Sequence, residues 1–240
     1  MPHALVIGAS RGLGFEFARQ YAADGWRVIG TYRADADGEK LRDAGVDALA
    51  LDVLDEDAPK RLEAALGARL SCQVSGQVSG QISGHLDLAI VNAGIHGPRQ
   101  VRIAHPPSTA DFDAVMHTNV LAPMRLLAAL AAPLEAAKGT LGVVTSRMGS
   151  VSAASTPNSL LYRVSKAAEN MVAKAAHIEL SPSGVRVLAL HPGWVRTDMG
   201  GPNADVGLED SIRGMRRVLA DARSHPSGGF FDYRGEAIAW

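Results

Sequence analysis

The amino-acid sequence predicts a single α/β domain, in which helices cover both faces of a doubly wound sheet of about seven mostly parallel strands. Short runs that are apolar almost throughout recur along the chain, which is typical of strands buried on both faces. Helical patterns alternate regularly with these runs. The length of 240 residues suits one domain over residues 1–240. In such a fold, ligands bind beyond the carboxyl ends of the strands.

The expected strands share continuous runs of Val, Ile, Leu and Ala. In chain order they are ALVIG (4–8), WRVIGTY (26–32), VDALALDV (46–53), LDLAIVN (86–92), TLGVVTS (140–146), VRVLALH (185–191) and GGFFDY (228–233). The expected helices carry apolar residues three or four positions apart and lie at 12–24, 56–70, 109–134, 160–180 and 209–222. In the fourth helix, for example, Val164, Ala168, Met171 and Ala175 mark one face.

One segment departs from this alternation. QVSGQVSGQISG (73–84) contains three copies of a four-residue unit. It is too short for a repeat architecture, and its Ser and Gly content predicts an extended surface loop. The segment enters the fourth strand at its amino end, opposite the expected ligand site, so we assign it no chemical role.

Charge and cysteine content exclude several functions. The chain has 24 basic and 25 acidic residues and a net charge of −1, which leaves no electrostatic footprint for nucleic acid or an anionic membrane. The lone cysteine, Cys72, excludes an intrachain disulfide and fits a reducing compartment. The amino terminus has no cationic lead, and two prolines, an arginine and a glutamate interrupt the longest apolar run, 120–137. We therefore expect a cytoplasmic protein with a buried or interface helix at 120–137 and no membrane span.

The eight histidines are scattered, without an HExxH pattern or partner cysteines, so no metal site is predicted. His96 and His191 are either residues that border the ligand site or ordinary loop residues.

The segment GASRGLG (8–14) joins the first strand to the first helix. Glycines at positions 8, 12 and 14 let the backbone turn tightly and approach a pyrophosphate, which then meets free N–H groups at the positive end of the helix. Because a strand precedes the glycines and a helix follows them, the context favours dinucleotide binding over a plain turn.

The segment YRVSK places Tyr162 four residues before Lys166. One interpretation is a surface pair of neighbours on a helix. The other is catalytic, because a nearby ammonium stabilises a phenolate and makes the phenol a better proton donor and acceptor near neutral pH. The pentapeptide alone does not decide between the two.

Six motifs, in the same order along nearly the whole chain, resemble those of the short-chain dehydrogenase/reductase family. They are GASRGLG (8–14), NAG (92–94), Asn119 within TNVLAP, Ser146 at the end of the fifth strand, YRVSK (162–166) and HPGWVRTDM (191–199). The sequence pattern SRMGS…YRVSK…HPGWVRTDMGG looks closest to that of the sniffer/C-factor-like branch of the family. The resemblance implies a Rossmann-type fold and an NADP(H)-dependent oxidoreductase that interconverts a carbonyl and an alcohol by hydride transfer.

The resemblance also implies roles for four residues. Lys166 would bind the nicotinamide ribose hydroxyls and lower the pKa of Tyr162, which would exchange a proton with the substrate oxygen. Ser146 would hydrogen-bond the same oxygen, and Asn119 would kink the long helix and hold a water that links Lys166 to bulk solvent. A structural alternative stays open for two of these residues. Ser146 can instead cap the turn after its strand, and Asn119 can instead face solvent.

The position of the serine needs a choice. Ser146 lies sixteen residues before Tyr162, three more than is usual in the family, and Ser150, at twelve, competes with it. We prefer Ser146 because it ends an apolar strand, and rigid elements position site residues better than loops do. The sniffer-like branch shares the longer spacing.

The choice of cofactor depends on the residues after the second strand. In GTYR (30–33), Tyr32 stands where an acidic residue would bond the ribose 2′-OH, and Arg33 follows it. Arg11 can reach the same 2′-phosphate, as in the NADP-preferring members that this pattern resembles. Each arginine alone can equally be a solvated side chain, but two guanidinium groups without an opposing carboxylate predict a preference for NADP(H) over NAD(H).

The predicted cofactor site is drawn from the loops after five of the strands. It comprises Gly8, Ser10, Arg11, Gly12, Leu13, Gly14, Arg33, Asp52, Val53, Asn92, Ala93, Gly94, Pro192, Gly193, Val195 and Thr197. Asp52 is assigned to the adenine amino group by the resemblance, with a turn-forming role as the alternative.

The predicted substrate pocket is largely apolar, which suits an apolar carbonyl. It comprises Ile95, His96, Met148, Leu160, Trp194 and Met199. The helices at 109–134 and 160–180 resemble those through which the family forms dimers and tetramers, so we expect a homodimer or homotetramer. A second class stays open, namely an NADP(H)-binding sensor or signalling protein of the C-factor type with little turnover. The joint presence of Ser146, Tyr162, Lys166 and Asn119 favours catalysis.

Overall fold

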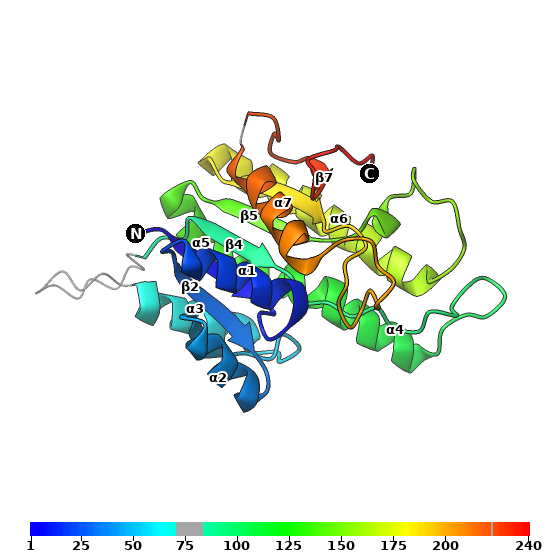
Figure 1. The fold of residues 1–240 in the computed structure, drawn as a ribbon, viewed down its shortest axis with the longest axis horizontal. Coiled ribbons are helices and arrows are strands. Elements are labelled where there is room, and N and C mark those ends of the chain that lie inside the picture. The colour runs from blue at the N-terminus through cyan, green and yellow to red at the C-terminus, as the bar shows by residue number, and fades with distance from the viewer. Residues whose placement is uncertain (71–83, 222) are drawn as a thin grey trace, which may run out of the picture.

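A computed structural model describes residues 1–70, 84–221 and 223–240, which form a parallel sheet between two layers of helices (Figure 1). The strands are β1 (His3–Ile7), β2 (Arg27–Tyr32), β3 (Asp47–Ala50), β4 (Leu88–Val91), β5 (Thr140–Val144), β6 (Arg186–His191) and β7 (Phe230–Asp232). The helices are α1 (Gly12–Ala23), α2 (Asp35–Asp43), α3 (Ala58–Leu70), α4 (Thr109–Met116), α5 (Ala122–Ala137), α6 (Leu160–Leu180) and α7 (Leu208–Ala220). A π-helical turn, η1 (His117–Leu121), joins α4 to α5, and two 3-10 turns are η2 (Arg147–Gly149) and η3 (Ser181–Ser183).

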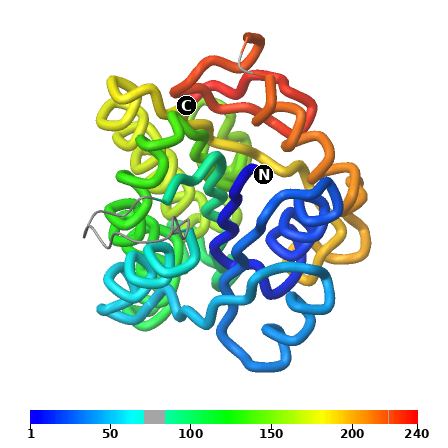
Figure 2. The backbone as a smooth tube through the Cα atoms, turned by 90° about the vertical axis from the view of Figure 1, so that its left-hand side faces the viewer, coloured from blue at the N-terminus to red at the C-terminus, as the bar shows by residue number. Residues whose placement is uncertain are grey.

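The apolar strands bury side chains on both faces. In β1, Leu5 and Ile7 pack with α3, α5 and α6, whereas Ala4 and Val6 pack with α1, α2 and α7. All four side chains are fully buried. Figure 2 shows the two layers, with α3, α5 and α6 on one side of the strands and α1, α2 and α7 on the other. The predicted doubly wound fold is confirmed.

The strand order is β3-β2-β1-β4-β5-β6-β7, and every neighbouring pair is parallel. The chain therefore leaves β1 in one direction across the sheet to reach β2 and β3, and in the other direction to reach β4 to β7. The loops that follow β1 and β4 diverge at this point and leave a crevice between them. Asn92 Nδ2, from the loop after β4, donates a 2.9 Å hydrogen bond to the Gly8 carbonyl after β1 and joins the two loops.

Two elements differ from the sequence prediction. The helix α2 was not predicted, because it buries only Gly38 and Leu41 and so has no apolar stripe. The helix predicted over 109–134 is divided into α4, η1 and α5. The repeat at 73–84 lies, apart from Gly84, outside the described residues.

The helical stretch Thr109–Ala137 is, by length and composition alone, long and apolar enough to cross a membrane. The core helix of a water-soluble fold passes the same test. Leu126, Leu130 and Leu134 of this stretch are almost fully buried against the sheet, as the sequence predicted for a buried helix at 120–137.

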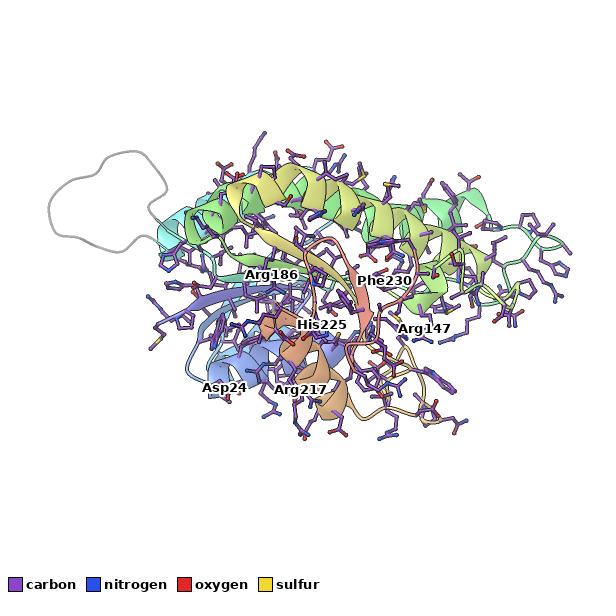
Figure 3. All side chains as sticks on the ribbon, turned by 90° about the horizontal axis from the view of Figure 1, so that it is seen from above. Asp24, Arg147, Arg186, Arg217, His225 and Phe230 are labelled. Carbon is purple, nitrogen blue, oxygen red and sulfur yellow. The ribbon has the colours of Figure 1, made fainter. Side chains whose placement is uncertain are left out.

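The far edge of the sheet is held by charged groups. Figure 3 shows Arg186 and His225 close to each other beside β6, and Arg186 Nη2 donates a 3.1 Å hydrogen bond to the His225 carbonyl. Arg147, from the turn after β5, lies near β7, with its Nη2 3.5 Å from Asp232 Oδ2. These contacts attach the segment before β7 to β6, and β7 itself to the turn after β5.

Candidate active site

A cavity of about 500 Å³ opens at the carboxyl ends of the central strands. Most predicted site residues line it, namely Gly8, Ser10, Arg11, Gly12, Leu13, Arg33, Val53, Asn92, Ala93, Gly94, Ile95, His96, Met148, Tyr162, Lys166, Pro192, Gly193, Trp194, Val195, Thr197 and Met199. Five predicted residues lie outside the lining: Gly14, Asp52, Asn119, Ser146 and Leu160. The sequence therefore located the cavity, and each of the five has a separate physical explanation.

Two glycines of the loop at the start of α1 leave no room for a side chain. A Cβ on Gly14 would lie 2.0 Å from the Gly8 carbonyl oxygen, and one on Gly8, whose φ is +82°, would lie 2.8 Å from the backbone of Ala93. The first turn of α1 contains no acidic residue, and the side chain of Arg11 does not cap it. Free N–H groups and the positive helix end therefore face the cavity, which is the environment that a pyrophosphate requires. Gly14 supports this loop from behind.

Tyr162 and Lys166 lie on the cavity wall, on the first two turns of α6. Both are nearly buried, at 8% and 4% exposure. Lys166 Nζ lies 5.8 Å from the centroid of the Tyr162 ring. Two neighbouring side chains on an exposed helix surface would not be enclosed in this way. The interpretation of YRVSK as a surface pair is therefore wrong.

The Lys166 ammonium is held from two sides. It donates a 3.2 Å hydrogen bond to the Val144 carbonyl at the end of β5 and a 2.6 Å hydrogen bond to Glu169 Oε2 on the next turn of α6. Burial alone would lower the pKa of Lys166, but the Glu169 carboxylate and, after it, Tyr162 raise this pKa above its ordinary value. Lys166 is therefore an ammonium at neutral pH.

Asn119 is fully buried in the middle of η1, so the alternative of a solvent-facing asparagine is wrong. Its Oδ1 accepts a hydrogen bond from the Ile95 N–H, and its Nδ2 donates to the Ile95 carbonyl, both at 2.8 Å. Nδ2 also donates to Ser165 Oγ at 2.9 Å. The side chain thus fastens the loop after β4 to α6 from behind the cavity wall. The predicted water link to Lys166 stays a prediction.

The π turn has a local cause. Pro123 has no N–H to donate to the Asn119 carbonyl, so the α-helical pattern cannot pass through this point unchanged. Instead the Ala122 N–H bonds to the His117 carbonyl, five residues earlier. Such turns insert one extra residue into a helix and are frequent at functional sites.

Ser146 and Ser150 have different surroundings. Ser146 Oγ accepts a 3.1 Å hydrogen bond from the Met148 N–H at the start of η2, which is the turn-capping alternative. Ser150 Oγ donates to the Ala239 carbonyl at 2.5 Å and accepts from the Ala153 N–H, so its hydroxyl is committed to the loop. Only Ser146 keeps its hydroxyl proton without a partner among the described residues, which supports the preference for Ser146 over Ser150.

The turn that carries Ser146 packs tightly on α6. A Cβ added to Gly149 would lie 2.6 Å from the carbonyl carbon of Lys166. Thr145 Oγ1 lies 3.4 Å from the Lys166 carbonyl oxygen. The glycine therefore lets the segment after β5 lie directly beside the Tyr162–Lys166 turn.

The arginine prediction needs one correction. Arg11 is not free of an opposing carboxylate, because its Nη1 lies 3.0 Å from Asp198 Oδ2 across the cavity mouth. Sequence analysis missed this pair because 187 positions separate the two residues. Arg33 lines the cavity and has no ion-pair partner within the described residues. Tyr32 packs flat on Gly38 of α2, where a Cβ would lie 2.5 Å from the ring.

Two other predicted residues have structural roles. Asp52 Oδ1 accepts a 3.0 Å hydrogen bond from the Leu54 N–H, which is the turn-forming alternative, and Val53 and Leu54 line the cavity in its place. Leu160 packs instead in a small apolar cluster with Leu161 and Val101 beside the pocket.

His96 and His191, the two histidines expected near the ligand site, differ in their position relative to the cavity. His96 lines the cavity. His191 lies outside the lining, and burial, followed by the Arg147 charge, lowers its pKa to about 4.

Sequence reasoning missed several residues that shape the site. Thr31 Oγ1 accepts a 2.8 Å hydrogen bond from the Gly8 N–H, and Arg99 Nη2 donates to the Met199 carbonyl at 2.5 Å. Glu169 was also missed, because it lies on the buried face of α6 with Tyr162 and Lys166, whereas the apolar face marked in the sequence, with Val164 and Met171, is exposed. Thr31 and Arg99 carried no signal because their contacts join distant segments.

A group of possible metal ligands lies at the opposite end of the sheet. Among the described residues, His3, His85 and Asp87 bring ligand atoms within 4.8 Å of one another. The absence of a metal site from the chain stays a prediction.

Comparison with known proteins identifies the family. The sequence profile of the family described as short chain dehydrogenase matches residues 2–205. The chain belongs to this family. The protein called C-signal, from Myxococcus xanthus, is 40% identical over 156 residues, which are 65% of this chain and 93% of that protein. The predicted family and its sniffer/C-factor-like branch are thereby confirmed.

Two solved structures align over all of this chain. A short-chain dehydrogenase/reductase from Burkholderia multivorans with bound NADP is 33% identical, with a TM-score of 0.81 over 99% of its length. The carbonyl reductase Sniffer of D. melanogaster is 25% identical, with a TM-score of 0.88 over its whole length. The chain thus shares its fold with one family member that is described as binding NADP and with another that is described as a carbonyl reductase.

Proposed function

We propose that this short-chain dehydrogenase is an NADP(H)-dependent oxidoreductase that interconverts a carbonyl and an alcohol. The observation that carries the proposal is that the nearly buried Tyr162 and Lys166 line the same cavity as a glycine loop in which Gly8 has no room for a side chain. A proton donor and a dinucleotide site within one cavity are the two requirements of carbonyl reduction by hydride transfer.

The lining residues fit a nicotinamide dinucleotide. The cradle formed by Gly8 and Gly12 admits a pyrophosphate, and Pro192, Val195 and Thr197 line the same cavity. When bound, the cofactor supplies or accepts the hydride. The chain's own residues position the substrate oxygen and move its proton.

Each proposed catalytic residue has a separate task. Tyr162 donates its phenolic proton to the carbonyl oxygen during reduction and takes it back during alcohol oxidation. The charged Lys166 stabilises the phenolate that remains and binds the ribose hydroxyls. Ser146 donates its hydroxyl proton to the same substrate oxygen. Asn119 acts from behind by fixing the backbone of Ile95.

The preference for NADP(H) over NAD(H) rests chiefly on Arg33. It is exposed, lines the cavity and follows Tyr32, where no carboxylate is available for a ribose 2′-OH. Arg11 can join it, because its pair with Asp198 is 74% and 82% exposed and such pairs contribute only about 0–1 kcal/mol. The neighbour with bound NADP supports this proposal.

The substrate is a small or medium apolar carbonyl. Ile95, Met148, Trp194 and Met199 form an apolar portion of the lining near Tyr162. The test is NADPH oxidation by the purified protein against a panel of aldehydes, ketones and quinones, with Tyr162→Phe measured in parallel. Turnover that requires Tyr162 supports the proposal, and equal turnover by both proteins would overturn it.

We also propose a homodimer or homotetramer in the cytoplasm. On α6, Val164, Met171 and Ile178 are 45%, 67% and 66% exposed. Their spacing of seven residues places them along one helix face. An apolar stripe of this kind is typical of a subunit interface. The lone cysteine supports a reducing compartment.

A second candidate function is NADP(H) sensing or signalling with little turnover. The relative named C-signal favours it. Cofactor binding without turnover on the whole carbonyl panel would support this second candidate over the first.

A further inference from the structure

Glu169 is a buried acid beside the cavity that the proposed chemistry leaves unexplained. It is 1% exposed, and its Oε2 accepts the 2.6 Å hydrogen bond from Lys166 Nζ. Its Oε1 is buried and has no hydrogen-bond partner among the described residues. Buried polar atoms are nearly always paired, so a half-satisfied carboxylate is unfavourable for folding. Its contact with Lys166 therefore points to a role beyond packing.

The hydrogen bonds of Lys166 limit what the ammonium can do. An ammonium has three N–H donors. One is directed to Glu169 Oε2 and one to the Val144 carbonyl. Because Lys166 also lines the cavity, one donor remains for a ligand. Glu169 and the end of β5 thus fix the ammonium between a helix and a strand.

We propose that Glu169 is the positioning residue of Lys166, which it keeps charged and fixed in place at the cavity wall. This inference rests on the proposed function, in which Lys166 must be an ammonium. A lysine enclosed by Val144, Gly94 and α6 loses its charge more easily than an exposed one, unless a carboxylate lies beside it. Glu169 supplies that carboxylate from three residues further along the same helix.

The other groups near the pair do not replace this carboxylate. Tyr162 lies on the same helix, and His96 stacks on its ring. From β5 and its following residue come the Val144 carbonyl and the Thr145 hydroxyl, neither of which carries a charge. Burial raises the pKa of Glu169 above its ordinary value, and the Lys166 ammonium and the Thr145 hydroxyl oppose this shift only in part. Glu169 is therefore the one carboxylate among the described groups that contact Lys166.

The test is Glu169→Gln, which keeps the shape of the side chain and removes its charge. Without the carboxylate, burial lowers the pKa of Lys166, and the ammonium is lost at a lower pH. We expect the alkaline limb of the kcat/KM profile to move down by about 1 pH unit or more. NADPH affinity, measured by fluorescence titration, should weaken over the same pH range. At pH 6 both quantities should stay close to those of the unchanged protein.

The matched control is Glu16→Gln. Glu16 is also buried, at 5% exposure, and it pairs with Arg19 three residues later at the same distance of 2.6 Å. It lies on α1 outside the cavity lining. Its pH profile should match that of the unchanged protein. A Glu169→Gln profile that also matches would overturn the proposal.

Glu169→Asp provides a second test, and it decides the question if Glu169→Gln fails to fold. Aspartate keeps the negative charge, but its side chain is one methylene shorter, so the carboxylate lies farther from the Lys166 ammonium. We expect the alkaline limb to stay in place while kcat falls, because the ammonium is charged but less well fixed. An unchanged kcat would overturn the positioning role. Tyr162→Phe tests the proposed function separately from the role of Glu169. If the Tyr162→Phe protein is active, the proposed function is wrong. If it is inactive, the proposed function stands, and the Glu169 variants alone decide whether Glu169 positions Lys166.

Discussion

The imidazole of His96 lies flat against the phenol of Tyr162, with ring centroids 4.4 Å apart and ring planes inclined by 14°. His96 follows β4 and Tyr162 belongs to the first turn of α6, so the stack joins two walls of the cavity. Burial lowers the pKa of His96, against an opposing hydrogen bond to the Gly97 carbonyl, so the imidazole is neutral at neutral pH. The phenol therefore has both a neutral imidazole and the Lys166 ammonium as neighbours.

Tyr162→Phe removes the phenolic hydroxyl and keeps the ring in this stack. We expect kcat for carbonyl reduction to fall by ~10²–10⁴, the usual contribution of general acid–base catalysis, with NADPH affinity retained. Steady-state kinetics and fluorescence titration measure the two quantities. Tyr21→Phe, at a buried core residue of α1, is the control and should leave kcat unchanged. Full activity of Tyr162→Phe would remove Tyr162 from the mechanism.

Ser146→Ala and Ser150→Ala should have different effects. The hydroxyl of Ser146 donates to no described residue and is proposed to bind the substrate oxygen, so its loss should lower kcat by ~10²-fold, as for a single oxyanion donor. Ser150 holds the loop through the Ala239 carbonyl, so its loss should lower Tm and leave kcat nearly unchanged. Kinetics and thermal unfolding on both variants check this. The opposite pattern would reassign the role to Ser150.

Arg33→Ala should weaken NADPH binding by about 10–10²-fold and leave NADH binding unchanged, because a hydrogen bond to a charged group contributes ~1.5–3 kcal/mol. Asp198→Asn is the informative partner variant. It frees Arg11 from its ion pair, so NADPH affinity should be kept or increased. Titration with both reduced cofactors gives the answer. Equal losses for NADPH and NADH in Arg33→Ala would show that Arg33 does not bind the 2′-phosphate.

His191 should make stability depend on pH. Burial lowers its pKa in the folded protein to about 4, from an ordinary value of 6.5. As pH falls below 6.5 the unfolded chain takes up the proton first, so stability present above that pH is lost progressively toward pH 4. The pKa difference corresponds to about 3 kcal/mol in the free energy of unfolding.

Urea unfolding at pH 7 and pH 4.5 measures this loss. His191→Asn should flatten the pH dependence of the unfolding free energy, whereas His105→Asn, in an exposed loop, should not. Parallel curves for all three proteins would show that another group is responsible.

Met171→Glu should disrupt subunit association. A carboxylate in the middle of the exposed stripe on α6 would be desolvated in an interface, so light scattering should show a smaller species than for the unchanged protein. Ile103→Glu introduces the same charge at an 86% exposed apolar residue of the loop after β4 and should leave the mass unchanged. A monomer before any substitution would contradict the proposed assembly.

The strands and the glycine loop could be predicted because their signals are local. An apolar run such as ALVIG and a glycine where no Cβ fits, such as Gly14, both reflect constraints on neighbouring residues. The Tyr162–Lys166 pair was also within reach, since spacing on one helix fixes proximity. The ion pair of Arg11 with Asp198 was not, because only the tertiary fold brings residues of α1 and the loop after β6 together. Helix α2 was missed because it covers the sheet through a single leucine, Leu41.

The π turn at Asn119 also sets the rotation of α5 about its own axis. Each residue of an α-helix turns the chain by about 100°, so one added residue re-aims everything that follows it. Ala114 of α4 and Thr118 of η1 line the cavity, whereas Leu126 and Leu130 of α5 face the sheet. If one residue were deleted here, α5 would be rotated by about 100° and its leucines would no longer face the strands. The same five residues that bring Asn119 to the Ile95 backbone thus also determine which face of α5 is buried against the sheet.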